Sequence, residues 1–239
     1  MDGTNKGTKS LHSSKNHCSD KHICLDSHDH CCGTSLIDEL AAHFPYAVLA
    51  VAFSMVILGV FYSFNAFSLA VNSEHRLFHI FHYMHLLFAG TGTVLSFRRY
   101  SKSIIGSILA GLFIPAFFCT FSDAILPYFG GMALGLDMYF HWCFVDHLNM
   151  VLPFLLTGII NGWVLSTYSS DRHVAYSIKF HFLHIAASAM ASLLYFAGFG
   201  FSDWMSSMGT TFLLMLFVVL LPCSLSDIVI PIWFAKKGK

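Results

Sequence analysis

The chain has 239 residues, of which 56% are hydrophobic and only 11% are charged. A water-soluble domain carries about 25% charged residues, so this composition argues against a soluble globular protein. Thirteen Lys and Arg balance thirteen Asp and Glu, which removes the positive field that nucleic-acid-binding proteins use. The apolar residues instead fall into runs of about 20, the length that crosses a bilayer. The sequence predicts an all-α, polytopic membrane helix bundle with six transmembrane helices.

Residues 1–43 are polar and are predicted to form a flexible cytoplasmic tail. In the cytosol its cysteines stay reduced, and thiols and imidazoles together bind transition metals. Their spacing does not fit a structural zinc finger, so we predict a flexible metal-collecting segment. The candidate tail ligands are His17, Cys18, His22, Cys24, His28, His30, Cys31 and Cys32.

From Phe44 onward, the apolar segments predict six spans, which form a membrane domain over residues 44–235. The predicted spans are 44–70, 77–97, 104–126, 138–167, 175–200 and 211–235, and the basic residues 236–239 follow them. Pro45 lies near a predicted helix start, where its missing amide proton costs little. The glycine-rich stretch 126–136 is predicted as a loop or a short re-entrant element.

Four histidines recur at intervals of three or four residues along the second predicted span. His75, His79 and His82 form a stripe on one side of this helix, and His85 lies on its flank. One histidine in a span is usually a satisfied packing residue. A ladder of four favours a transition-metal path or a proton relay.

Further acids and imidazoles lie in or beside the other spans. An ionised side chain at the centre of a bilayer costs about 2.5–3.5 kcal/mol on insertion scales, so such residues normally face the bundle interior. The remaining candidate metal ligands are Asp123, Asp137, His141, Asp146, His147, His181, His184 and Asp227. Cys143 is a further potential donor among them.

A repeated motif divides the predicted membrane domain into two halves. The pattern C-x-x-S-D-x-x-x-P occurs at residues 119–127 and again at 223–231. Upstream, His79-x-x-His82 on the second span matches His181-x-x-His184 on the fifth. These matches predict two three-span repeats, residues 44–127 and 138–231. An odd number of spans per repeat makes the topology inverted, as in many secondary transporters.

The distribution of basic residues predicts the orientation. With six spans, Arg76 is the one basic residue that falls on the side opposite the two termini. The positive-inside rule therefore predicts a multi-pass protein with both termini in the cytoplasm.

These features favour a membrane transporter, rather than an enzyme, for a divalent transition-metal cation. Zinc is the first choice, and Fe, Mn, Ni, Cu or Co also suit the ligands. The expected partners are the lipid bilayer and the metal ion, without nucleic acid, and homo-oligomers are compatible with this layout. The predicted outer or central site consists of His75, His79, His82, Asp123, Asp137 and His141. Its predicted inverted counterpart consists of His181, His184 and Asp227.

Two other functions remain open on the sequence alone. The first is a redox protein in which His82 and either His181 or His147 hold a haem b from two facing helices. The second is an intramembrane metallohydrolase of lipids, with Ser122 or Ser226 as an accessory group.

Overall fold

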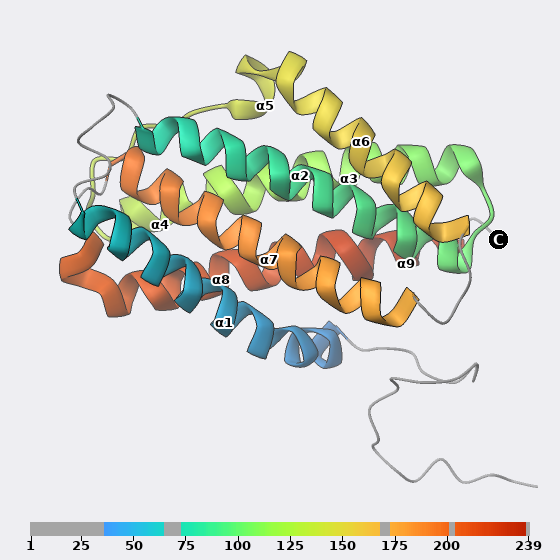
Figure 1. Cartoon of the computed structure of the whole chain (residues 1–239), viewed down its shortest axis with the longest axis horizontal. Coiled ribbons are helices and arrows are strands. Elements are labelled where there is room, and N and C mark those ends of the chain that lie inside the picture. The colour runs from blue at the N-terminus through green and yellow to red at the C-terminus, as the bar shows by residue number, and fades with distance from the viewer. Residues whose placement is uncertain (1–35, 65–72, 168–172, 201–203, 238–239) are drawn as a thin grey trace, which may run out of the picture. The chain divides into compact units, whose positions relative to one another are not determined.

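The computed structural model describes residues 36–64, 73–167, 173–200 and 204–237, and every regular element in these ranges is a helix (Figure 1). The predicted all-α class is therefore confirmed. The tail ligands between His17 and Cys32 lie outside the described residues, so their predicted role stays a prediction.

Six long helical segments make up the bundle. Their bounds are α1 Leu36–Ser63, α2 Ser73–Tyr100, α3 Ile104–Thr120 with α4 Leu126–Ala133, α6 Leu148–Thr167, α7 His173–Gly198, and α8 Met208–Ser224 with α9 Ile230–Lys237. Two π-helical turns, η1 Phe121–Ile125 and η4 Leu225–Val229, join α3 to α4 and α8 to α9 without a break in the helix. The short α5 (Cys143–Asp146) precedes α6, and the 3-10 turn η3 (Trp204–Ser207) precedes α8.

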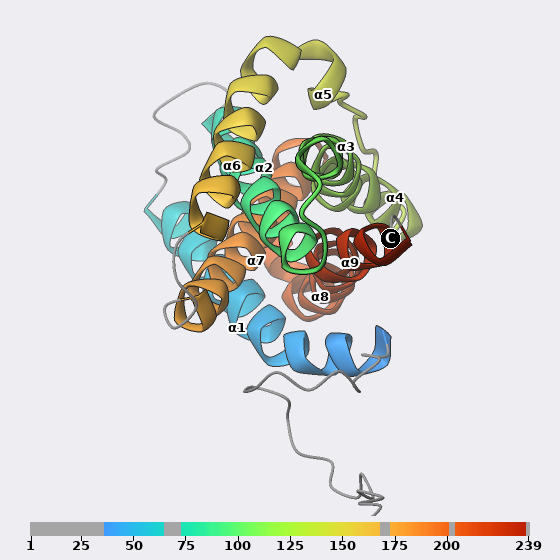
Figure 2. The same ribbon diagram turned by 90° about the vertical axis from the view of Figure 1, so that its right-hand side faces the viewer.

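Successive long helices alternate in direction along the bundle (Figure 1). The segment α3–α4 runs opposite to α8–α9, and α2 runs opposite to α7. Helices α2 and α7 are central, because α2 packs on α3, α6 and α7 while α7 packs on α1, α2 and α8 (Figure 2). Polar residues in the middle of these two helices, such as His85 and His184, are therefore buried against protein.

Within the described ranges, four helical segments are long and apolar enough to cross a membrane, which is consistent with an integral membrane protein. They are His43–Ser63, Ile104–Ala133, Leu148–Thr167 and Met208–Lys237. Helices α2 and α7 have 28 and 26 residues, but they are less uniformly apolar. Their histidines and terminal basic residues lower the apolar content, and burial between other helices makes an apolar surface unnecessary.

The loop or re-entrant element predicted for residues 126–136 is wrong over most of its length. The helix continues through η1 and α4 as far as Ala133. The turn that ends it contains Gly135, whose φ of +77° lies in the left-handed region that glycine adopts without strain. The glycine content of this stretch thus marks the end of a helix rather than a loop.

The starts of the fourth and of the first predicted span differ from the prediction, whereas the fourth ends at Thr167 as predicted. Residues 136–142 are not helical, and α6 begins only at Leu148. The backbone N–H groups of this segment bond the end of α7 and the residue after it. The Tyr139 N–H donates to the Phe199 carbonyl at 2.8 Å, and the His141 N–H donates to the Tyr195 hydroxyl at 3.1 Å. At the other end of the bundle, α1 begins at Leu36, so Pro45 lies inside it.

Candidate metal centre

Both copies of the C-x-x-S-D-x-x-x-P motif form the same local structure. In the first copy the Leu126 N–H donates to the Phe121 carbonyl, which is the i to i−5 bond of a π-helix. Pro127 follows and has no N–H. The Ser122 carbonyl therefore has neither its α-helical nor its π-helical donor. The Ser192 hydroxyl of α7 supplies the missing bond at 3.1 Å.

The second copy repeats this arrangement with the roles of the central helices exchanged. The Ile230 N–H donates to the Leu225 carbonyl, and Pro231 leaves the Ser226 carbonyl without a backbone donor. Here the Thr93 hydroxyl of α2 donates to that carbonyl at 3.1 Å. Helix α7 thus bonds the first motif copy, and α2 bonds the second.

Asp123 is the hub of a fully buried hydrogen-bond network. Its Oδ2 accepts from Nδ1 of His82 at 2.8 Å and from Nδ1 of His85 at 2.7 Å. Its Oδ1 accepts from the hydroxyl of Ser122 at 2.8 Å and from that of Ser188 at 3.1 Å. Four donors hold one carboxylate, so its position and the orientation of both imidazoles are fixed.

His85 and His184 meet at the centre of the bundle. Their Nε2 atoms lie 2.8 Å apart, and the Nδ1 of His184 is in close ion-pair contact with Oδ2 of Asp227. Each imidazole thus directs Nδ1 to the carboxylate of its own half and Nε2 to the other imidazole. If each Nδ1 carries the ring proton, two bare nitrogens face one another beside two carboxylates, an arrangement that a proton or a metal ion between the nitrogens would stabilise.

Two buried cysteines add thiol donors at the same point. The Sγ of Cys119 lies 3.5 Å from Nε2 of His85, and the Sγ of Cys223 lies 3.8 Å from it. The donor atoms of His85, His184 and Cys223 all lie within 4.8 Å of one another, and the thiol of Cys119 contacts His85 beside them. We call these four residues the central site. All four are at most 2% exposed.

The donor set of the central site suits a borderline or soft transition metal. Imidazole nitrogens bind zinc at about 2.0–2.1 Å and thiolates at about 2.3 Å, commonly in tetrahedral sets of nitrogen and sulfur. Asp123 and Asp227 bond the remote nitrogens of the two histidines, as carboxylates commonly do behind metal-binding imidazoles. Gly92 makes room for this arrangement, because a Cβ there would lie 2.9 Å from Oδ2 of Asp227.

A second cluster lies nearer the end of the bundle at which α2 begins. Donor atoms of His79, His141 and His147 lie within 4.8 Å of one another, and all three side chains are partly buried. We call them the histidine triad. The Oδ2 of Asp146 lies 3.5 Å from Nδ1 of His141. Burial lowers the pKa of His141 from its ordinary value, and the Asp146 carboxylate opposes this shift.

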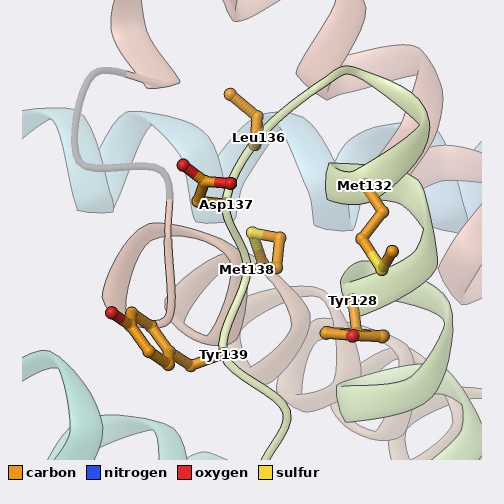
Figure 3. A pocket seen from close by; sticks show the side chains of 6 residues that line it. All are labelled: Tyr128, Met132, Leu136, Asp137, Met138 and Tyr139. Atoms are coloured by element: carbon orange, nitrogen blue, oxygen red, sulfur yellow. The ribbon is translucent and has the colours of Figure 1, made fainter.

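Two predicted ligands with described side chains, His75 and Asp137, lie apart from both clusters and from the carboxylates that contact them. The Nε2 of His75 bonds the Gly198 carbonyl at 2.7 Å, and its ring stacks on Phe199. Asp137 is exposed and lines an open pocket of about 360 Å³ with Tyr128, Met132, Leu136, Met138 and Tyr139 (Figure 3). His181 lies in α7, but its side chain is outside the described residues.

Several residues that supply donors or hydrogen bonds at the central site are not among the ligands predicted from the sequence. Cys119 and Cys223 head the repeated motif, so the motif itself was the signal that could have identified them. Ser188, Ser192 and Thr93 gave no such signal, because hydroxyl groups are common in helices and these three act across helix contacts.

The two motif copies and the residues that contact them recur at constant spacings. The cysteines, serines, aspartates and prolines of the motif copies lie 104 residues apart, and the segments Ile104–Ala133 and Met208–Lys237 have 30 residues each. On the central helices, His85 and His184 lie 99 residues apart, as do Thr93 and Ser192. The structural counterpart of His184 is therefore His85, whereas the sequence alignment paired it with His82.

No protein-family model, curated protein or solved structure matches this chain.

Proposed function

We propose that the protein transports a divalent transition-metal cation, with zinc as the most suitable ion, through a six-span bundle with the central site as its binding site. The contact between the Nε2 atoms of His85 and His184 carries this proposal. Two imidazole acceptors, two thiols and two carboxylates converge in a space closed to water, and a cation is the ligand that such a group of donors stabilises.

The proposed architecture is an inverted repeat, with residues 44–127 and 138–231 as its halves. Three features support it: the opposite directions of α3–α4 and α8–α9, the reciprocal bonds of Thr93 and Ser192, and the packing of α1 on α7 and of α6 on α2. A site on the axis that relates two inverted halves can open to either side of the membrane by rocking of one half against the other.

The proposed orientation has both termini in the cytoplasm. Arg98 and Arg99 end α2 and Lys236 and Lys237 end α9, at the same end of the bundle. Since basic residues favour the cytoplasmic side, the histidine triad would lie toward the outer side. The His- and Cys-rich tail would then collect or deliver ions on the cytoplasmic side.

At the central site the geometry favours a metal ion over a haem, and the burial of the motif serines argues against a lipid substrate. The haem pairs considered from the sequence, His82 with His181 or His147, are other histidines. A porphyrin between His85 and His184 would need the two rings on opposite faces of the macrocycle, and nitrogens 2.8 Å apart leave no room for it. Ser122 and Ser226 are fully buried, with at most 1% exposure, so a lipid headgroup does not reach them in this conformation.

Zinc uptake into proteoliposomes tests the proposal. We expect His85→Ala and Cys223→Ser to reduce the initial rate at least tenfold, measured with a zinc-sensitive dye trapped inside. Ser224→Ala is the matched control, because its buried hydroxyl bonds only the Leu220 carbonyl of its own helix at 2.8 Å. Wild-type uptake rates in both site variants would contradict transport through this site. A Soret band that His85→Ala removes would favour haem instead.

A further inference from the structure

The histidine triad has the features of a built metal site. The Nε2 atoms of His79 and His141 lie 3.1 Å apart. The ring of His147 lies 4.8 Å from that of His79 and 5.6 Å from that of His141, measured between centroids. Three imidazoles, from α2, from the non-helical segment before α5 and from the turn between α5 and α6, therefore converge on one point.

Contacts behind the triad hold its members in position. The Nδ1 of His79 donates to the His75 carbonyl at 2.6 Å, which leaves its Nε2 as the acceptor toward the other rings. The backbone of His141 is bonded to the Tyr195 hydroxyl, which in turn donates to the Tyr139 carbonyl at 3.0 Å. The ring of His141 also stacks on Phe199. This support from α7 fixes the segment that carries His141.

The triad differs from the central site in its ligand chemistry. Three neutral imidazoles without a thiol leave one tetrahedral position open to water or to an incoming ligand. The triad is also partly exposed, whereas the central site is closed. It is not a copy made by the repeat, because the residue 99 positions after His79 is Ile178. A site of this kind suits reversible capture of an ion from water.

Two further donors lie between the triad and the central site. His82 follows His79 by three residues and precedes His85 by three, so each step is about 4.5 Å along α2. The Nε2 of His82 is buried, and among the described residues the thiol of Cys143 is a polar neighbour of this imidazole. Cys143 is fully buried and begins α5, between the two triad histidines of that segment.

We propose that the histidine triad is a separate loading site that captures the metal ion and passes it to the central site through His82 and Cys143. This inference rests on the proposed transport function. It adds a second bound ion, a ligand set made only of imidazoles, and a path of donors about 9 Å long between the two sites.

Zinc stoichiometry of the purified full-length protein separates this inference from the proposed function. Zinc bound by the His-rich tail should contribute equally in all variants. A difference in stoichiometry between variants therefore reflects zinc bound in the helix bundle. We expect His79→Ala to bind one zinc fewer than the wild type, and His85→Ala also to bind one fewer. His147→Ala serves as a second triad variant if His79→Ala does not fold. Asp137→Asn is the control, because that exposed carboxylate lies outside both clusters, and it should bind as the wild type does.

Transport kinetics complete the test. Loss of the loading site should raise the zinc concentration for half-maximal uptake about tenfold and change the maximal rate less than twofold. Cys143→Ser should keep both ions and lower the maximal rate. If the triad variants keep the full stoichiometry while His85→Ala loses one ion, the loading site is refuted and the central site stands. If only the triad variants lose an ion, the central site is refuted and the triad stands alone.

Discussion

Replacement of Gly92 by alanine tests whether Asp227 orients His184. The new Cβ would lie 2.9 Å from Oδ2 and 3.1 Å from Cγ of Asp227. Ordinary carbon contacts are about 3.5–4.0 Å, so the carboxylate must move by about 0.5 Å or more. Loss of such an outer carboxylate contact typically lowers metal affinity 10- to 100-fold, which is about 1.4–2.8 kcal/mol. We expect Gly92→Ala to weaken zinc binding by this factor.

The substitution separates the site from the helix that carries Gly92. Alanine is a better helix former than glycine by about 1 kcal/mol, so the variant should not weaken α2 itself. Gly90→Ala is the matched control, because its Cβ would be 3.4 Å from the nearest atom, the Leu155 carbonyl oxygen. Zinc affinity of the purified proteins is measured by competition with a chromophoric chelator. Equal affinity of Gly92→Ala and the wild type would refute the orienting role of Asp227.

Three other predictions concern the network and the ligands. Asp123→Asn replaces a carboxylate that accepts four hydrogen bonds by an amide that has two N–H donors of its own. Its melting temperature in detergent should therefore fall clearly below that of Ser224→Ala. An unchanged melting temperature would contradict the role of Asp123 as the hub of the network. Ser192→Ala and Thr93→Val each leave a buried carbonyl without a donor, and each should destabilise by about 1–3 kcal/mol. A large loss of thermal stability in only one of them would argue against equivalent halves. In the Co²⁺-loaded protein, Cys223→Ser should weaken the thiolate-to-metal absorption band, and an unaltered band would exclude this sulfur as a ligand.

The helical class and the presence of polar residues in the bundle interior were predictable from the sequence, because both depend on local patterns. Apolar runs predict the helices, and an acid such as Asp123 in such a run must face the bundle interior. The repeated motif was also visible, and its proline explains the π-helical turn once the backbone donors are counted. The helix through residues 126–133 is not predictable in the same way, because glycine is a poor helix former and Gly130 and Gly131 lie within it.

The membership of each cluster was not predictable, since it depends on contacts between helices. A stripe of four histidines on α2 does not reveal that His75 bonds a backbone carbonyl, that His79 belongs to the triad, and that His85 meets α7. Asp137 was selected for its spacing from His141, but the segment between them is not helical, so the two residues do not share a helix face.

X-ray absorption at the zinc edge tests the central site most directly. The His79→Ala protein, loaded with one equivalent of zinc after removal of tail-bound metal by a weak chelator, should show two nitrogen neighbours at about 2.0–2.1 Å and one or two sulfurs at about 2.3 Å. The sulfur signal should decrease in the Cys223→Ser protein. A first shell made only of nitrogen and oxygen, or a sulfur signal that Cys223→Ser leaves unchanged, would contradict a metal ion held between the two halves.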